Sequence, residues 1–270
     1  MRNVSLKNGE QGFTLIEMSV VLIIIALLAG SIFVGQTLLR QSQINGTMAD
    51  AQRYIAATNT FAQKYNALPG DMPNATSYWG AQSSCPTGYG SPPAVGTLTC
   101  NGDGNGMVYA WSSAVSSGTN YAEEFTYWQH LAIAGMIPGT YTAAAGPTLW
   151  IDSVPGVNIP AGRLNGMGIG IIYLGDNAPA FFSRGTMHVY FLGGREVGMY
   201  PANAILTTDE AQSFDSKYDD GSPATGNVFT FSSGSGWGNT SGCTTNNGTA
   251  NVYNVAMPGI QCALILATGF

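Results

Sequence analysis

One apolar stretch near the N-terminus limits what this chain can fold into more than any other feature. Residues 13–34 read FTLIEMSVVLIIIALLAGSIFV, twenty-two residues with a single charged side chain. A helix of that length reaches across the hydrocarbon core of a bilayer. A cleavable secretory signal has a shorter apolar region that ends at a small-residue cleavage site, whereas this stretch continues into an amphipathic region. We therefore expect a membrane-spanning helix that stays attached.

The charges around this stretch predict its orientation. Arg2 and Lys7 precede it, and basic residues prefer the cytoplasmic side, so the N-terminus is expected in the cytoplasm and the residues after about Val34 on the far side. Glu17 is the ionisable group within the stretch, and such groups are costly in a membrane. Glu17 is either a functional group that needs a partner or a helix-end carboxylate that reaches the headgroups.

The residues around Glu17 resemble a known processing signal. The sequence GFTLIE, residues 12–17, follows a short polar leader with Lys7 and precedes the hydrophobic helix. It resembles the prepilin signal of type IV pilins and type II secretion pseudopilins. The resemblance implies that a membrane prepilin peptidase cuts after Gly12, that the new amino terminus at Phe13 is N-methylated, and that Glu17 is kept for assembly. It covers about the first twenty-five residues.

A physical reason stands beside this resemblance. Cleavage creates a positive amine at Phe13 in apolar surroundings, and a buried amine and carboxylate tolerate burial as a pair. Glu17 of one subunit can neutralise Phe13 of its neighbour. The resemblance further implies a homo-oligomeric helical filament, assembled from the bacterial inner membrane by a platform protein and an ATPase. The head would be periplasmic in the precursor, and the filament would be a periplasmic pseudopilus or a cell-surface pilus.

After Gly35 the apolar pattern becomes periodic. Apolar side chains recur at alternating spacings of four and three, which is one helical stripe, and Asp50 lies off it. Pro69 and Gly70 end the pattern. We expect a leader at residues 1–12, a transmembrane half at 13–34, an amphipathic half at 35–68 and a head at 69–270. The stripe consists of Ile44, Met48, Ala51, Ile55, Thr58, Ala62 and Tyr65.

The head alternates short β-like runs with turns rich in glycine, serine and asparagine, which favours an antiparallel sheet. Two helical patches interrupt the runs, and the second opens with Thr207 and Glu210 at the spacing of a capping box. We therefore expect an α+β, pilin-like fold. The expected helices are Tyr121–Met136 and Thr208–Tyr218, and the expected strands are Met107–Trp111, Thr148–Ile151, Ile169–Leu174, Met187–Leu192, Asn227–Phe231 and Cys262–Leu266.

Composition limits the partners. The chain has nine basic and fifteen acidic side chains, a net charge of −6, and 9% charged residues where roughly 25% is ordinary. Removal of the leader would take away Arg2, Lys7 and Glu10 and change the net charge to −7. Without a basic cluster, the electrostatic footprint of a nucleic-acid-binding protein is missing.

The four cysteines predict disulfides. Cys85, Cys100, Cys243 and Cys262 allow three pairings, and no CxxC or Cys/His cluster indicates zinc. Pairing between sequence neighbours is simplest, and each bond would contribute about 3 kcal/mol by restricting the unfolded chain. Disulfides require an oxidising compartment; the alternative is four thiols in a reduced cytosol.

A first candidate calcium loop lies at residues 101–106. Asn101, Asp103 and Asn105 alternate with glycine, and glycine stands sixth, as in the first half of an EF-hand. Position twelve is Ser112, so the bidentate glutamate is absent, and Glu123 or Glu124 could replace it through the fold. The alternative is an ordinary turn.

A second candidate calcium group contains Asp215, Asp219 and Asp220, near the end of the second expected helix. Carboxylates at a helix C-terminus are disfavoured by the helix dipole, and a cation would relieve this. The alternative is a solvated turn in which Gly221 and Pro223 stop the helix. The sequence requires no cofactor. The ion that it suggests is a structural calcium at one of these two groups.

Signs of an enzyme are weak. His130 and His188 have no nucleophile motif around them and are interpreted as surface or strand histidines. The glycines at 166, 168 and 170 lack the strand-then-helix context of a nucleotide loop. The sequence favours a structural filament subunit that is not an enzyme. The alternative is a membrane-anchored binding or adhesion protein that keeps its leader and offers exposed aromatics, among them Trp79, Tyr89, Trp237 and Tyr253.

Overall fold

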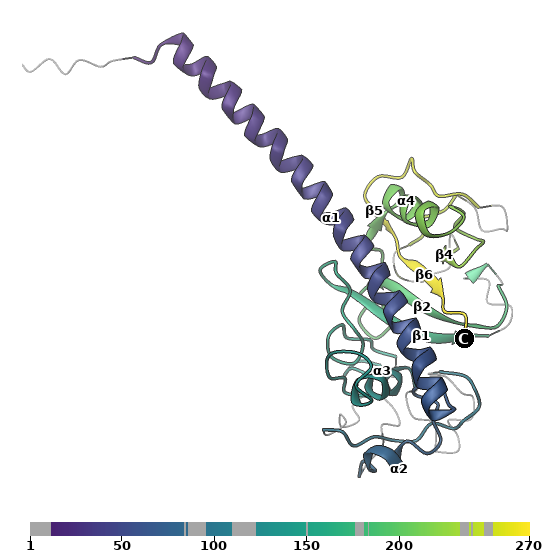
Figure 1. Ribbon diagram of the computed structural model, residues 1–270. Coiled ribbons are helices and arrows are strands. Elements are labelled where there is room, and N and C mark those ends of the chain that lie inside the picture. Colours follow the sequence, from purple (N-terminus) through teal and green to yellow (C-terminus); the bar gives the residue numbers. More distant parts are fainter. Residues whose placement is uncertain are drawn as a thin grey trace, which may run out of the picture. The chain divides into compact units, whose positions relative to one another are not determined.

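The computed structural model divides into two compact units, Met1–Ser42 and Gln43–Phe270. Helix α1, Leu15–Tyr65, is 51 residues long and runs from the first unit into the second (Figure 1). The residues that the structure describes are 12–83, 85, 96–109, 123–149, 151–175, 181–182, 184–232, 238, 240–245 and 251–270.

In the first unit, α1 is apolar on every side. Its large hydrophobic side chains from Leu15 to Leu39 are all exposed, with Leu15 at 92%. Among the described residues, α1 alone is long and apolar enough to cross a membrane by length and composition, with a mean hydropathy of 2.7 in its most apolar window. A helix that is hydrophobic all round must be buried in lipid or among other helices.

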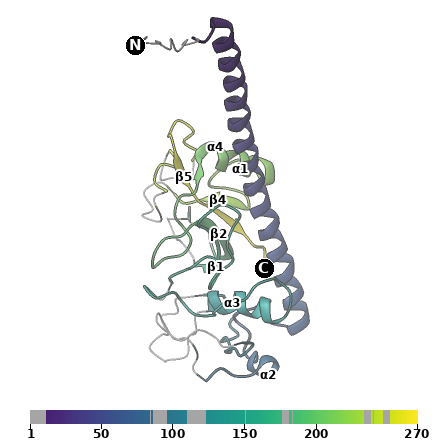
Figure 2. The same cartoon turned by 90° about the vertical axis from the view of Figure 1, so that its left-hand side faces the viewer.

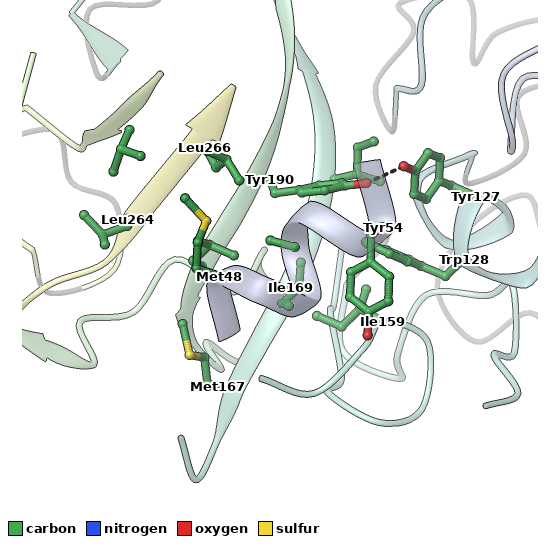
Figure 3. Close-up of a cluster of buried hydrophobic side chains, with 14 of the residues drawn as sticks. Met48, Tyr54, Tyr127, Trp128, Ile159, Met167, Ile169, Tyr190, Leu264 and Leu266 are labelled. Carbon is green, nitrogen blue, oxygen red and sulfur yellow. Dashed lines mark hydrogen bonds between the residues drawn. The ribbon is translucent and has the colours of Figure 1, made fainter. Parts of the chain in front are cut away.

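In the second unit, α1 buries one stripe against the rest of the head (Figure 3). The predicted stripe is correct at Ile44, Met48, Ala51 and Thr58, but Ile55, Ala62 and Tyr65 are only half-buried. A strict alternation of four and three repeats every 3.5 residues, whereas an α-helix turns every 3.6, so the stripe drifts around the helix. Further along the helix, the stripe did not include three buried positions, Tyr54, Ala57 and Phe61.

The end of α1 comes earlier than predicted. The helix stops at Tyr65 rather than Leu68, because Asn66 adopts a left-handed conformation with a φ of 52°. Its N–H donates to the carbonyl of Ala62 at 2.8 Å. Asparagine tolerates this conformation better than most residues, so Asn66 caps the helix before Pro69 is reached.

The head contains a four-stranded antiparallel sheet in the order β1-β2-β6-β4, which confirms the α+β prediction. The strands are β1 Met167–Leu174, β2 Met187–Gly194, β4 Val228–Thr230 and β6 Leu264–Ala267. Tyr190 of β2 pairs with Ile171 on one side and with Leu266 on the other. Figures 1 and 2 show the Gln43–Tyr65 part of α1 lying along this sheet.

Both faces of the sheet are buried. The face toward α1 carries Ile169, Tyr190 and Leu264, and the opposite face forms a second apolar cluster around Phe191 and Phe229. Successive side chains of a strand point to opposite faces, so β2 supplies both layers. The strands are therefore almost continuously apolar.

Shorter elements complete the head. They are α2 Thr76–Trp79, α3 Glu123–Ile133, β3 Leu206–Thr207, α4 Thr208–Tyr218 and β5 Ile260–Cys262. Strands β3 and β5 form a second, two-stranded sheet. The predicted capping box opens α4: the Glu210 N–H donates to the Thr207 hydroxyl at 3.2 Å, and the Thr207 N–H donates to the Glu210 carboxylate at 2.9 Å.

Two expected strands are wrong in their described parts, and a third is divided. Residues 107–109 make one bond to the β1 edge, from the Tyr173 N–H to the Val108 carbonyl. Residues 148 and 149 fold into a turn because the Asp152 carboxylate accepts the Thr148 N–H. The strand at 262–266 is split at Ala263, where the chain passes from one sheet to the other. Ala110, Trp111 and Trp150 lie outside the described residues.

The cysteines join as sequence neighbours. Cys85 is bonded to Cys100 and Cys243 to Cys262, and no described cysteine is free. The second bond ties the end of β5 to the preceding loop, and Thr230 of β4 lies beside it. Each bond closes a short loop of the chain and so restricts the unfolded state.

The buried stripe predicts the cost of truncating α1. Phe61 is fully buried against Trp79 and His130, so Phe61→Ala is expected to lower the free energy of unfolding by about 3 to 5 kcal/mol. Asn59→Ala, at an exposed position on the same helix, is the control and is expected to change it by less than about 0.5 kcal/mol. Urea unfolding of a soluble Gln43–Phe270 fragment measures both, and equal effects would contradict the assigned packing.

Candidate functional site

The start of α1 is closed by the side chain that the sequence singled out. The Thr14 N–H and hydroxyl both donate to the Glu17 carboxylate at 2.8 Å, and the Glu17 N–H donates to the Thr14 hydroxyl at 3.3 Å. This is a capping box, in which each residue satisfies a helix-end group of the other. Phe13, directly before it, is 80% exposed.

Sequence reasoning missed this local role of Glu17. The signal was present, because Thr14 and Glu17 have the same spacing as Thr207 and Glu210. The cap places the carboxylate at the positive end of the helix dipole, where a negative charge is favoured. It also holds the carboxylate four residues from the amine that cleavage after Gly12 would create.

The loop at residues 101–106 lies beside two acidic residues from elsewhere in the chain. Carboxylate oxygens of Asp71, Asp103 and Glu123 all lie within 4.8 Å of one another. Asp71 follows α1 by a few residues, and Glu123 opens α3, so three separate segments meet here. Of the two candidates for the missing ligand, Glu123 is the one beside Asp103.

The asparagine side chains of this loop already accept backbone N–H groups. The Asn101 side-chain oxygen accepts the Thr76 N–H at 2.9 Å, and that of Asn105 accepts the Met107 N–H at 2.7 Å. These asparagine oxygens therefore fix the backbone around the loop. The acidic side chains that gather beside it come from separate segments of the chain. Ser112 lies outside the described residues.

Crowding of these carboxylates changes their acidity. Burial, together with the negative charges of Asp103 and Asp71, raises the pKa of Glu123 to about 8. Burial likewise raises the pKa of Asp71 to about 6, against N–H donors from Gly104, Asn105 and Gly106 that favour its charged form. The cluster therefore carries more negative charge than its surroundings stabilise, which is the situation that a proton or a cation relieves.

Glu124, the next residue, lies outside this acidic cluster and is buried. It is 1% exposed, and neither carboxylate oxygen has a hydrogen-bond partner among the residues that the structure describes. Burial raises its pKa well above the usual range, so the neutral form is favoured.

The second acidic group also comes together. Carboxylate oxygens of Asp215, Asp219 and Asp220 lie within 4.8 Å of one another. Asp215 accepts the Tyr253 hydroxyl at 2.8 Å, Asp219 accepts the Val228 N–H at 2.9 Å, and Asp220 accepts the Ser222 N–H at 2.9 Å. These carboxylates hold the turn after α4, so they are more than solvated turn residues.

The two acidic groups differ in how well they are satisfied. Hydrogen bonds from Thr225 and Ser222 lower the pKa of Asp220, whereas burial raises the pKa of Asp215 to about 6. The Asp71 group has two strongly raised members and therefore a greater need for a counter-charge. Calcium remains a prediction at both groups, and the raised pKa values of Asp71 and Glu123 favour the first.

The histidines are structural. His130 lies on the expected helix, here α3, but it is fully buried rather than at the surface: Nδ1 accepts the Gly70 N–H at 2.9 Å and Nε2 contacts the Thr99 hydroxyl at 2.9 Å. Burial lowers the pKa of His130 to about 3, so it is neutral. His188 lies in β2, as predicted for a strand histidine, and accepts the Val108 N–H at 3.0 Å.

The remaining candidates take packing roles. Trp79 lies 5.2 Å from Tyr65 between ring centroids, and Tyr253 is buried with its hydroxyl on Asp215. The glycines at 168 and 170 lie in β1 against Pro201, in no nucleotide loop. Tyr89 and Trp237 lie outside the described residues.

Comparison with known families supports the N-terminal resemblance. Residues 7–33 match the family described as the prokaryotic N-terminal methylation motif. The chain therefore carries the N-terminal signal of type IV pilins and pseudopilins, on an α+β head with a long N-terminal helix. No curated protein and no solved structure matches the chain. The match ends at residue 33, before the head begins.

The raised pKa of Glu123 predicts a dependence of stability on pH. Between the ordinary value of 4.5 and about 8, the folded state binds more protons than the unfolded chain, so the free energy of unfolding falls as pH rises through this window. The Gln43–Phe270 fragment in EDTA is expected to melt at a higher temperature at pH 6 than at pH 8. Glu123→Gln should reduce this difference, and Asp209→Asn, at an exposed carboxylate, should leave it unchanged. A wild-type melting temperature that rises over this range would contradict the assignment.

Calcium is expected to act on the same cluster. At about 100 times its Kd, a ligand specific for the folded state adds about 2.7 kcal/mol, which corresponds to about 5 to 10 °C in melting temperature for a head of this size. The test is thermal unfolding of the fragment at pH 8 with calcium or EDTA. Asp103→Asn should remove the shift if the ion binds here, and Asp220→Asn should remove it if the ion binds at the other group. Identical curves with calcium and EDTA would exclude both sites.

Proposed function

We propose that this chain is a structural subunit of a type IV pilus or a type II secretion pseudopilus. It is made as a precursor in the bacterial inner membrane, cleaved by prepilin peptidase between Gly12 and Phe13, and N-methylated on Phe13. A platform protein and an ATPase then assemble it into a homo-oligomeric helical filament for adhesion, motility or protein secretion. The observation that carries the proposal is the methylation motif at residues 7–33 on a helix that is apolar on every side.

The exposed apolar surface of the first unit supports assembly. Large side chains such as Leu15, Leu27 and Phe33 are at least 67% exposed, on all sides of the helix. Such a surface is stable in lipid, and after extraction from lipid it is stable when packed against identical helices. The same residues therefore serve the membrane precursor and the core of a filament, with no catalytic group required.

Glu17 connects processing with assembly in this proposal. Its carboxylate lies at the helix end, next to Phe13, with the Thr14 N–H and hydroxyl as its partners. A carboxylate with two oxygens keeps acceptor capacity beyond these two bonds. The amine that cleavage creates on Phe13 of a neighbouring subunit would use this capacity and neutralise the charge.

Two substitutions of Glu17 separate its roles. Glu17→Ala removes both the cap and the charge, and is expected to insert and be cleaved normally but to lower the amount of subunit in sheared filaments by about tenfold or more. Glu17→Gln keeps an acceptor for the capping box and removes the charge. If the amine is the partner, Glu17→Gln fails like Glu17→Ala.

The readout is immunodetection of the subunit in membranes and in sheared or purified filaments, with Ser19→Ala, at an exposed position on the same helix, as the control. Filaments from Glu17→Gln at wild-type yield would contradict charge pairing and leave the cap as the role of this residue. Normal filaments from both variants would contradict any role of Glu17 in assembly.

A further inference from the structure

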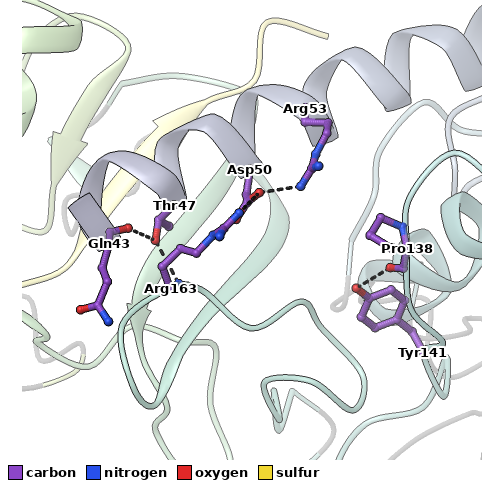
Figure 4. Close-up of polar contacts among 7 residues, drawn as sticks. All are labelled: Gln43, Thr47, Asp50, Arg53, Pro138, Tyr141 and Arg163. Atoms are coloured by element: carbon purple, nitrogen blue, oxygen red, sulfur yellow. Dashed lines mark hydrogen bonds and ion pairs between the residues drawn. The ribbon is translucent and has the colours of Figure 1, made fainter. Parts of the chain in front are cut away.

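Two arginines share one carboxylate at an edge of the buried face of α1. Asp50 accepts Arg53 at 2.6 Å, and it accepts Nε of Arg163 at 2.6 Å and Nη2 of Arg163 at 3.0 Å (Figure 4). Asp50 was expected on the polar face, but it is only 11% exposed in its side chain, whereas those of Arg53 and Arg163 are 58% and 55% exposed. The cluster of Arg53, Asp50 and Arg163, here called the arginine cluster, has one positive charge in excess.

The arginine cluster has unused binding capacity. Each guanidinium carries five N–H donors in a rigid fork, and Asp50 accepts from only a few of them. The nearby carboxylate that raises the pKa of Arg163 is Asp50. A planar acceptor such as a second carboxylate would complete the cluster and neutralise its excess charge.

A groove continues from the arginine cluster. It has a volume of about 510 Å³ and lies between α1 and the loop before β1. Its lining is mixed, with a second basic residue, Arg195, which pairs with the buried Asp152 at 3.7 Å. The lining residues used here are Arg163, Arg195, Val154, Leu164 and Met167.

Helix α4 lies at the opposite edge of the buried face. Lys217 and Tyr218 both bond the Asn45 side chain of α1, at 2.9 Å and 3.2 Å. Asn45 and Asp50 are five residues apart, which is about 500° of helix rotation and places them about 140° apart around α1. Figure 1 shows α4 on one side of α1 and the loop before β1 on the other.

The outer side of α4 is acidic and small. Asp209, Ser213 and Ser216 are exposed and follow one another at spacings of four and three, and the exposed Asp220 lies just beyond the end of α4. Asp209 and Tyr218 are nine residues apart, so this stripe, here called the acidic stripe, lies on the side of α4 away from α1. Next to its start, Ile260 pairs with the cap residue Thr207 and is 49% exposed.

We propose that the arginine cluster and its groove receive the acidic stripe of a second copy of this chain. The inference rests on the proposed function, and it names the head contact between neighbouring subunits. Carboxylates at the two ends of the stripe supply the acceptors that the guanidinium forks lack, and the serines between them permit close approach. Ile260 supplies an apolar contact for the groove.

The placement of the two surfaces determines the kind of assembly. Because they lie at opposite edges of one face, a subunit uses one surface toward each of two neighbours. Such a contact is heterologous, and its repetition gives an open helical array rather than a closed dimer. The contact uses residues of the Gln43–Phe270 unit alone, so it is independent of Glu17 and Phe13.

Cross-linking on assembled filaments tests the contact. The full-length chain carrying both Arg53→Cys and Ser213→Cys is produced with its assembly machinery and treated with a short bis-maleimide; no described native cysteine is free to react. A heterologous contact predicts a ladder of dimers, trimers and longer species from the double variant. Mixed filaments of the two single variants should give dimers and no ladder. The control pair, Asn59→Cys with Ser213→Cys, should give no ladder.

A charge exchange tests the same contact without cysteines. Arg53→Glu is expected to lower filament yield by about fivefold or more, and Asp209→Lys in the same chain should restore it, because the reversed pair is again complementary. Lys64→Glu makes the same charge change on the same helix outside the arginine cluster, and should leave the yield within about twofold of wild type.

The outcomes separate the two proposals. If wild-type filaments form but the double cysteine variant gives no ladder and Arg53→Glu assembles normally, the head contact is wrong and the proposed function stands. A dimer from Arg53→Cys alone would show a two-fold contact and overturn the heterologous assignment. If the wild-type chain enters no filament, the proposed function fails, and this contact fails with it.

Discussion

The structure depends on one helix, α1, whose two halves have different surroundings. Up to Leu39, α1 is apolar on all sides and exposed, and from Ile44 it buries a single stripe against the head. The stripe packs on β1, β2 and β6, and the ring of Trp128 from α3 lies against Tyr54 at 5.2 Å. Because the stripe forms part of the core, a head without residues 43–65 would leave that face of its sheet uncovered. The helix is therefore a part of the head as well as its anchor.

The same packing explains where the polar groups of the head are found. Hydroxyls of Thr58, Tyr127 and Tyr190 form a buried chain from α1 through α3 to β2. Figure 3 shows the bond between Tyr127 and Tyr190. His130 joins α3 to the residues after α1 and to Thr99. Each buried polar atom of this set has a partner, as the low polarity of its surroundings requires. Glu124 is an exception, since neither of its carboxylate oxygens has a partner among the described residues. The carboxylates of Asp71 and Glu123 do have N–H donors, but burial still raises the pKa of both.

Local signals in the sequence predicted the features that depend on nearby residues. The apolar run, the GFTLIE motif and the capping box of α4 are each contained in one continuous segment of the sequence. The disulfides join cysteines that are neighbours in the sequence, so each closes only a short loop. Strands β1 and β2 were identified because their apolar runs are long. Thr14 and Glu17 have the same T-x-x-E spacing, but because they lie in an apolar run, the sequence directs attention to the charge of Glu17 in a membrane rather than to a helix cap.

Features that depend on residues far apart in the sequence could not be predicted from local patterns. The role of Asp50 requires Arg163, 113 positions away, and the acidic cluster requires Asp71 beside Glu123. The stretch at residues 148 and 149 has a strand-like composition, but the Asp152 side chain holds it in a turn. Nor does any local pattern show that His130 is buried, because its partners come from the segments after α1 and before the calcium-like loop.

The intact mass of the natural protein tests the central claim most directly, when it is measured separately on sheared surface material, on periplasmic filaments and on membranes. The account predicts the mass of residues 13–270 with one added methyl group and four fewer hydrogens, for the two disulfides. Its presence in the surface fraction would favour a pilus, and its restriction to the periplasm a pseudopilus. A mass that begins at Met1 or Arg2 in every fraction would contradict the account, and would make α1 the tether of an anchored binding protein.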